Sequence, residues 1–230
     1  MKTVVVLQNE ADAPAAYLGE ALDRRGIEWT AVRLDLGETP PKPESVSAVA
    51  ALGGAMGAYD ERTYPFLIDE KRFLATCTKI GIPVLGICLG CQLLADALGG
   101  RAYRADSAEV VFAPVEPTSD GIGDPIAAAL SGRRVIRFHQ DTFDLPPGAT
   151  LLATGGGFNH AFRRGTAVGI QPHPAVTAAL LGEWLADGDA RQLAIDSGTD
   201  PDLLVAAFAA AEAEVVETAA AVFDAWIDEI

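Results

Sequence analysis

An apolar run that ends at a cysteine flanked by two glycines is the feature that most constrains the fold of this chain. The run spans Ile82–Ile87, Cys88 follows it, and Gly86 and Gly90 lie two residues to either side of the cysteine. A helical pattern then covers Leu89–Leu98. This order predicts a strand, a sharp turn and a helix, with a thiol in the turn. A nucleophile there needs small neighbours, and we expect the helix N-terminus to lower the pKa of the cysteine.

Composition limits the class of protein and its partners. The chain has 230 residues, of which 50% are hydrophobic and 21% charged, so a folded α/β domain is expected and disorder is not. The formal net charge of −15 disfavours nucleic acid as a partner. Three cysteines without regular spacing do not form a secreted disulfide framework, and no apolar stretch reaches membrane-spanning length. We therefore expect a cytoplasmic protein without a membrane partner.

Strand and helix patterns alternate through the first hundred residues. Such alternation predicts a parallel sheet with helices on both faces, and ligands of such sheets bind beyond the carboxyl ends of the strands. Gly53-Gly54 and Cys88 both follow predicted strands. The predicted strands are Thr3–Leu7, Glu28–Leu34, Val46–Leu52 and Ile82–Ile87, and the predicted helices are Pro14–Arg25, Tyr64–Lys79 and Leu89–Leu98.

The second part of the chain favours short strands, followed by helices after Pro174. A long helical pattern opens at Asp200-Pro201, an N-cap followed by a first-turn proline. Its apolar side favours a role in covering the core, and pairing with a second copy in a homodimer stays open. We expect a single domain over residues 1–230, with a helical C-terminal segment from about residue 176. The predicted strands are Arg101–Arg104, Val110–Val115, Arg134–Phe138, Thr150–Ala153, His160–Arg163 and Ala167–Gln171.

A cysteine nucleophile needs a base, and the chain has only three histidines. His173 lies just past a predicted strand, between two prolines that restrict its backbone. His139 follows another predicted strand and opens a polar turn. His160 has no such setting, and we expect it at the surface.

Four segments, in order, resemble the class I, or triad-type, glutamine amidotransferases. Gly-Ile-Cys-Leu-Gly-Cys-Gln around Cys88 resembles the nucleophile motif of that family, and Leu52–Gly57 resembles its oxyanion loop. His139–Gly148 together with Asn159–Phe162 is similar to the GMP-synthase-like members, and Gly169–Pro174 resembles the histidine motif. The resemblance implies a flavodoxin-like three-layer α/β sandwich, with a mostly parallel central sheet and helices on both faces.

The resemblance also implies a reaction. Cys88 would attack the side-chain amide of glutamine, form a thioester and release ammonia, while His173 would take and return the proton. The main-chain N–H groups of Gly54 and Leu89 would form the oxyanion hole, where each donor is typically worth about 3 kcal/mol.

Substrate binding and partners follow from the same resemblance. Gln92 and the main chain of Gln140 and Asp141 would hold the amino-acid end of the substrate, which is glutamine or a related γ-glutamyl amide. The sequence has no ATP-binding glycine loop, so any use of the ammonia would need a separate synthase subunit. No cofactor and no metal site is implied.

The histidine motif departs from the family at one position. The family places a glutamate two residues after the histidine, where it orients the imidazole, and this chain has Ala175 there. The loss of an orienting acid can cost several kcal/mol in an acyl-transfer site. Because a thiol is more acidic and more nucleophilic than a hydroxyl, a Cys88–His173 dyad stays open. An acid from elsewhere, Asp141 or Glu109, is the other option.

These observations favour glutamine hydrolysis, and two alternatives remain. One is a γ-glutamyl hydrolase that acts on a larger amide. The other is a weak or inactive relative that binds a ligand or partner, which Ala175 favours. A redox site at Cys88-Leu89-Gly90-Cys91 would leave the other motifs unexplained, and a zinc site lacks a second paired cysteine motif.

Overall fold

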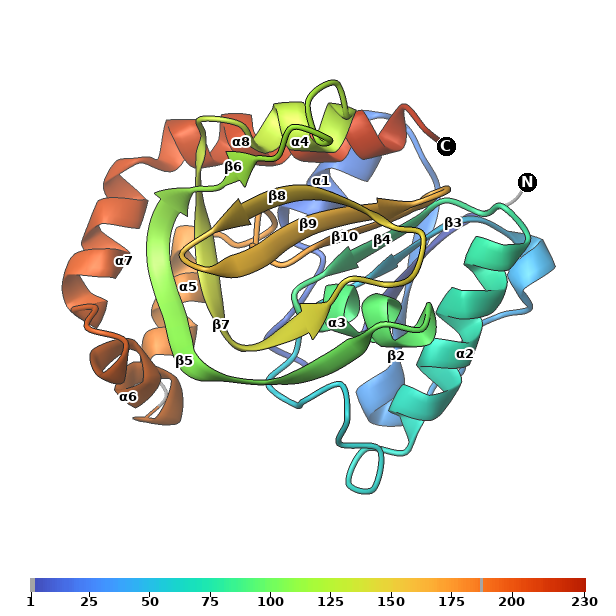
Figure 1. The fold of residues 1–230 in the computed structure, drawn as a ribbon, viewed down its shortest axis with the longest axis horizontal. Helices are drawn as coiled ribbons and strands as arrows, with labels where there is room; N and C mark the ends of the chain where they lie inside the picture. Colours follow the sequence, from blue (N-terminus) through green and yellow to red (C-terminus); the bar gives the residue numbers. More distant parts are fainter. Residues whose placement is uncertain (1–2, 187) are drawn as a thin grey trace.

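An eight-stranded sheet forms the centre of the computed structural model, which describes residues 3–186 and 188–230 (Figure 1). The strand order is β2-β1-β3-β4-β10-β9-β8-β6. The first five strands are parallel, and the remaining pairs are antiparallel. Their bounds are β1 Thr3–Gln8, β2 Trp29–Arg33, β3 Val46–Ala51, β4 Val84–Ile87, β6 Glu116–Pro117, β8 Thr150–Gly155, β9 Phe158–Arg164 and β10 Ala167–Ile170.

Helices cover both faces of this sheet because its central strands are apolar on both sides. In β1, Val4 and Val6 face one core cluster, while Val5 and Leu7 face the other. The first cluster is closed by α1 (Tyr17–Arg24), α4 (Pro125–Leu130) and α8 (Glu212–Ile227), and the second by α2 (Phe66–Lys79) and α3 (Leu89–Ala97). The three-layer α/β architecture expected from the sequence is thus confirmed.

A two-stranded antiparallel ribbon runs along one side of the main sheet (Figure 1). It consists of β5 (Arg101–Pro114) and β7 (Arg134–Asp144), in a register that places Glu109 opposite His139. A third apolar cluster packs Val110 and Ile136 of this ribbon against helices that follow the sheet. These helices are α5 (Ala178–Ala186), α6 (Gly188–Asp196) and α7 (Pro201–Ala210). Among the described residues, no helix combines the length and the apolar character needed to cross a membrane.

Three predictions about local structure need correction. The predicted strands Arg101–Arg104 and Val110–Val115 are not separate: both belong to the one strand β5, which is irregular between them and ends at Pro114, one residue before Val115. The polar turn expected from His139 is part of β7, because His139 and Asp141 pair with residues of β5. The long C-terminal helix is two helices, interrupted at Ala211, whose backbone leaves the helical region at φ −102° and ψ 20°.

The predicted role of the C-terminal pattern in covering the core is confirmed. Val222, Phe223 and Trp226 of α8 are completely buried in the first cluster. Asp200 caps α7 as expected, since its carboxylate accepts the N–H groups of residues 202 and 203.

Close backbone contacts explain the two glycines beside Cys88. A Cβ added to Gly86 would lie 2.5 Å from the carbonyl oxygen of Gly90, and one added to Gly90 would lie 2.1 Å from that of Ala51. The start of α3 therefore packs directly against the carboxyl end of β3, with no room for a side chain.

We expect Gly90→Ala to lower the free energy of unfolding by about 3 kcal/mol or more, because two backbones must separate to admit the methyl group. Gly182→Ala in α5 is the matched control. Its added Cβ meets nothing within 4 Å, so a gain of up to about 1 kcal/mol is expected from helix propensity. Urea unfolding of the two variants measures both effects, and equal stabilities would contradict the packing argument.

Candidate active site

Cys88 occupies a strained turn between β4 and α3. Its backbone has φ 51° and ψ −108°, a conformation that L-residues rarely adopt. The Cys88 N–H donates to the carbonyl of Ile170 at the end of β10, at 2.9 Å. Such strain costs on the order of 1–3 kcal/mol and persists where the surrounding structure enforces it. The strand–turn–helix predicted around the thiol is present.

The thiol of Cys88 is buried and un-ionised in the free protein. Burial raises its pKa to about 12, although the Leu89 N–H at the start of α3 and an amide N–H of Gln171 act in the opposite direction. The helix N-terminus therefore lowers the pKa only in part, and the expectation of a net lowering is wrong. A thiolate at this site has to be generated by a base.

His173 and Cys88 line the same space beside Gly53, at the end of β3. A Cβ placed on Gly53 would lie 3.6 Å from Cε1 of His173 and 3.8 Å from Cβ of Cys88. The strands β3, β4 and β10 are neighbours, so their carboxyl ends bring Gly53, Cys88 and Gln171 together. Residues far apart in the sequence thus meet at the edge where ligands of parallel sheets bind.

A main-chain carbonyl and a tryptophan hold the His173 ring. Nε2 lies 3.3 Å from the carbonyl oxygen of Phe138, and this oxygen can only accept, so Nε2 carries the hydrogen and Nδ1 has a free lone pair. The Trp184 ring contacts the imidazole edge-to-face, with centroids 5.1 Å apart, and stacks on Phe138. Burial lowers the pKa of His173 to about 4, so the ring is neutral at pH 7.

Ala175 packs in the first apolar cluster and supplies no polar group. Among the described residues, neither Glu109 nor Asp141 contacts the His173 ring. Nε2 of His173 is hydrogen-bonded to the Phe138 carbonyl, and the Glu109 carboxylate pairs with Arg137, His139 and His160.

The predicted oxyanion loop follows β3 and lies against the start of α3. A Cβ on Gly54 would collide with the side chain of Leu89 at 2.9 Å, so the two residues are in direct contact. The next N–H, that of Ala55, is taken by the carboxylate of Glu10 at 2.7 Å. Within the described part of the chain, the Gly54 N–H has no acceptor, which leaves it available to a ligand.

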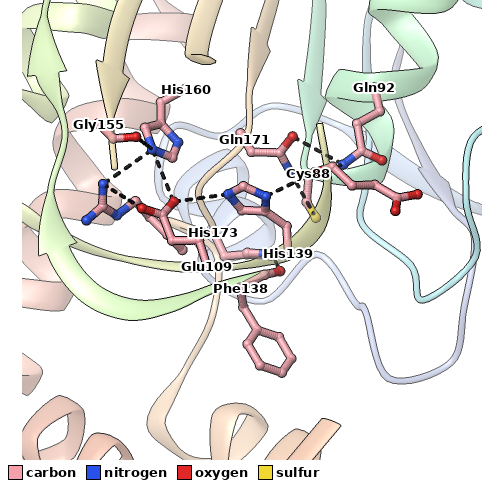
Figure 2. A network of polar contacts seen from close by, with 11 residues as sticks. Cys88, Gln92, Glu109, Phe138, His139, Gly155, His160, Gln171 and His173 are labelled. Carbon is pink, nitrogen blue, oxygen red and sulfur yellow. Dashed lines mark hydrogen bonds and ion pairs between the residues drawn. The ribbon is translucent and has the colours of Figure 1, made fainter. Parts of the chain in front are cut away.

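Hydrogen bonds connect two of the predicted substrate-binding residues, Gln92 and Asp141, to the sulfur of Cys88 through Gln171. Nε2 of Gln92 donates to the Asp141 carbonyl at 3.1 Å and to Oε1 of Gln171 at 3.2 Å. Gln171 then donates to Sγ of Cys88 at 3.5 Å (Figure 2). Gln140 lies further out, where its side chain accepts from Arg104.

A buried cluster of charged and polar groups adjoins this chain. Oε2 of Glu109 lies 3.1 Å from Nε2 of His139 and 3.2 Å from Nε2 of His160, and Oε1 lies 3.2 Å from Arg137 (Figure 2). The expectation of a surface position for His160 is wrong, because β9 points it into the interior, where it is completely buried. Of the described residues, Glu109, His139 and His160 form the group whose ligand atoms could hold a metal ion.

A second buried carboxyl lies beneath the oxyanion loop. Asn9, which follows β1, donates to the Leu52 carbonyl at 3.2 Å and to Glu70 of α2 at 3.4 Å. Burial raises the pKa of Glu70 to about 8, so this carboxyl is protonated at pH 7.

Sequence reasoning missed several of these contacts. Gln171 was visible as part of the histidine motif, but its bond to Cys88 was not. Trp184 gave no signal and Glu70 only a weak one, since a tryptophan in a helical pattern is ordinarily a core residue and a glutamate ordinarily a surface residue. A polar residue on the inward side of an amphipathic helix was the available hint for Glu70.

One known protein family matches the part of the chain that carries this site. The family model described as "Glutamine amidotransferase class-I" matches residues 18–187, which include both halves of the site. The chain belongs to the class I glutamine amidotransferases. The expected family is thereby confirmed.

Relatives of this amidotransferase come from several bacteria. A "GMP synthase [glutamine-hydrolyzing]" of Thermomicrobium roseum is 44% identical over 141 residues, which cover 60% of this chain and 25% of the relative. This amidotransferase thus matches about a quarter of that relative. A "Putative glutamine amidotransferase-like protein YfeJ" of Salmonella typhimurium is 28% identical over 169 residues, covering 68% of this chain and 67% of the relative.

Solved structures resemble the whole amidotransferase fold. A glutamine amidotransferase from Thermotoga maritima superposes with a TM-score of 0.85 at 30% identity, covering 99% of this chain and 98% of the other. A glutamine amidotransferase from Methylobacillus flagellatus has a TM-score of 0.88 at 23% identity, covering 100% and 96% of the two chains, a likeness of fold.

We expect alkylation of Cys88 by iodoacetamide to accelerate about tenfold per pH unit between pH 6 and 10, because the thiolate fraction rises that way below a pKa of about 12. Peptide mass spectrometry follows Cys88 separately from Cys77 and Cys91. A rate that levels off near pH 7 would instead indicate a thiolate–imidazolium pair in the free protein.

We expect Glu70→Gln to become progressively more stable than the wild type as pH rises from 5 to 9. The folded-state pKa of Glu70 is raised to about 8 from 4.5, so its favourable contribution is complete below pH 4.5 and is lost as pH rises through 8. The loss is at most about 4–5 kcal/mol. Urea unfolding measures it, with Asp69→Asn on the exposed side of the same helix as the control. A constant difference between Glu70→Gln and the wild type would contradict the assignment.

Proposed function

We propose that this protein hydrolyses the side-chain amide of glutamine through a thioester on Cys88 and releases ammonia. The observation that carries the proposal is that the Cys88 side chain, with its un-ionised thiol, and the neutral His173 imidazole border the same position beside Gly53. Nδ1 of His173 has its lone pair free, because Nε2 donates to the Phe138 carbonyl. His173 is therefore equipped to act as a general base.

Acylation begins when Nδ1 of His173 takes the thiol proton and Sγ of Cys88 attacks the amide carbon. The oxygen becomes negative in the tetrahedral intermediate, and the N–H groups of Gly54 and Leu89 stabilise it. The C–N bond then breaks, and the nitrogen leaves as ammonia with the proton from His173. Water, deprotonated by His173, attacks the thioester, which gives glutamate and restores the Cys88 thiol.

In this proposal, Gln92 and the main chain of Gln140 and Asp141 form the part of the site that holds the amino-acid end of the substrate. Gln92 is buried with its amide committed to Asp141 and Gln171, so it holds the site in shape. The main chain of Gln140 and Asp141 supplies the contacts to the substrate. Recognition through the main chain tolerates different side chains.

The Phe138 carbonyl performs the orienting role that an acid performs in the family pattern. It fixes the tautomer and the ring direction of His173, but it carries no full charge to stabilise an imidazolium. We therefore propose a working dyad with lower activity than a complete triad. The GMP synthase relatives suggest that the ammonia serves a separate synthase partner.

The test is ammonia and glutamate release from L-glutamine by the purified protein. We expect release by the wild type and a loss of at least about 100-fold in Cys88→Ser, because the serine hydroxyl is a much weaker nucleophile without a full triad. Cys77→Ala, a change of a buried cysteine of α2 in the second apolar cluster, serves as the control and should keep its activity. Equal release by wild type and Cys88→Ser would contradict the proposal.

Two other outcomes separate the alternative functions. Faster cleavage of a γ-glutamyl anilide than of glutamine would indicate a γ-glutamyl hydrolase for larger amides. No hydrolysis, together with no labelling of Cys88 by a glutamine-like diazoketone, would indicate the binding protein that Ala175 favours.

A further inference from the structure

His139 is placed between two oxygens that can only accept hydrogen bonds. Nδ1 lies 3.0 Å from the main-chain carbonyl of Asp141, and Nε2 lies 3.1 Å from Oε2 of Glu109 (Figure 2). A neutral imidazole has one N–H, so one of the two contacts would set a lone pair against an oxygen. The ring satisfies both contacts when both nitrogens carry hydrogen.

Glu109 is the counter-ion of this ring. Its carboxylate also pairs with Arg137 at 3.2 Å and with His160 at 3.2 Å, and all these side chains are buried. Burial alone would raise the pKa of Glu109, but the hydrogen bonds from the histidines and the charge of Arg137 outweigh it and lower the pKa to about 2. The Glu109 carboxylate is therefore ionised at pH 7.

His160 does not share the constraint on His139. Its Nε2 lies 3.1 Å from the Gly155 carbonyl and 3.2 Å from Glu109, so one N–H serves both oxygens. Its Nδ1 has no partner in the described part of the chain, and burial lowers its pKa. A single N–H on Nε2 therefore satisfies the oxygens around His160, whereas the two oxygens around His139 lie at its two different ring nitrogens.

The far side of the His139 ring reaches the proposed substrate-binding segment. The Asp141 carbonyl accepts from both Nδ1 of His139 and Nε2 of Gln92, which occupies its two lone pairs and fixes the peptide plane. Gln92 continues through Gln171 to the sulfur of Cys88. A continuous set of hydrogen bonds thus joins the Glu109 carboxylate to the nucleophile.

We propose that His139 is a positioning residue, an imidazolium that bridges the Glu109 carboxylate and the Asp141 carbonyl and so fixes the segment that binds the amino-acid end of glutamine. This inference rests on the proposed function, which assigns Gln140 and Asp141 to the substrate. His139 acts through Asp141 and does not touch the reacting atoms.

A bound divalent metal ion is the competing explanation of this cluster. Glu109, His139 and His160 offer ligand atoms within 4.8 Å of one another. The Arg137 guanidinium, however, lies 3.2 Å from the same carboxylate and 3.3 Å from Nε2 of His160. A doubly charged ion beside this fixed positive charge in a buried site would be repelled, so the structure favours a proton.

Nitrogen-15 NMR of histidine-labelled protein tests the protonation directly, even if the protein proves not to hydrolyse glutamine. We expect both ring nitrogens of His139 to be protonated at pH 7 in the wild type. In Glu109→Gln, which removes the counter-ion, we expect the neutral form. A neutral His139 in the wild type, or one zinc ion per chain by elemental analysis of the purified protein, would overturn the proposal.

Kinetics test the positioning role. We expect His139→Gln to raise KM for glutamine about 10- to 100-fold with a smaller change in kcat, because one amide cannot donate on both sides. The rate at which iodoacetamide alkylates Cys88 in His139→Gln should stay within about threefold of the wild-type rate. An unchanged rate shows that the site around Cys88 is intact and that the higher KM comes from misplaced substrate. Asp144→Asn, at the exposed end of the same strand, is the control.

A wild-type KM in His139→Gln would overturn the positioning role while leaving the proposed function intact. Failure of the wild type to hydrolyse glutamine would instead count against the proposed function.

Discussion

The close approach of α3 to the ends of β3 and β4 is the constraint on which the site depends. Only glycine fits at Gly86 and Gly90, and the turn between them forces Cys88 into a left-handed backbone conformation. The same contact places the predicted oxyanion loop against Leu89 and places Cys88 beside the end of β10. The strain at Cys88 is sustained by two apolar cores, one on each face of the sheet.

Burial determines the protonation states of Cys88 and His173, the proposed reacting pair. It raises the pKa of Cys88 to about 12 and lowers that of His173 to about 4, so both groups are neutral before substrate binds. A pair of this kind avoids the cost of holding two charges in a dry site, and it requires proton transfer during attack. The Phe138 carbonyl and the Trp184 ring keep His173 in the tautomer that this transfer needs.

The strands and helices of the main sheet could be predicted because both faces of the central strands are apolar and the helices are amphipathic. The ribbon β5–β7 was harder, because the polar residues from His139 to Thr142 are typical of a turn and become a strand only through pairing with β5. The break at Ala211 gave no signal, since alanine favours helix on both sides of it. His160 was misplaced for a similar reason, as its burial depends on partners in β5 and β7.

The sequence by itself determined the family and the thiol in a strand–turn–helix, and it singled out His173 as the proposed base, since these are carried by short motifs with little freedom of interpretation. The tertiary structure alone decided what surrounds them. The orienting carbonyl of Phe138 lies 35 residues from His173, and the carboxylate that faces His139 comes from another strand, 30 residues away. Protonation states depend on burial and on such distant neighbours, and neither is written in the local order of residues.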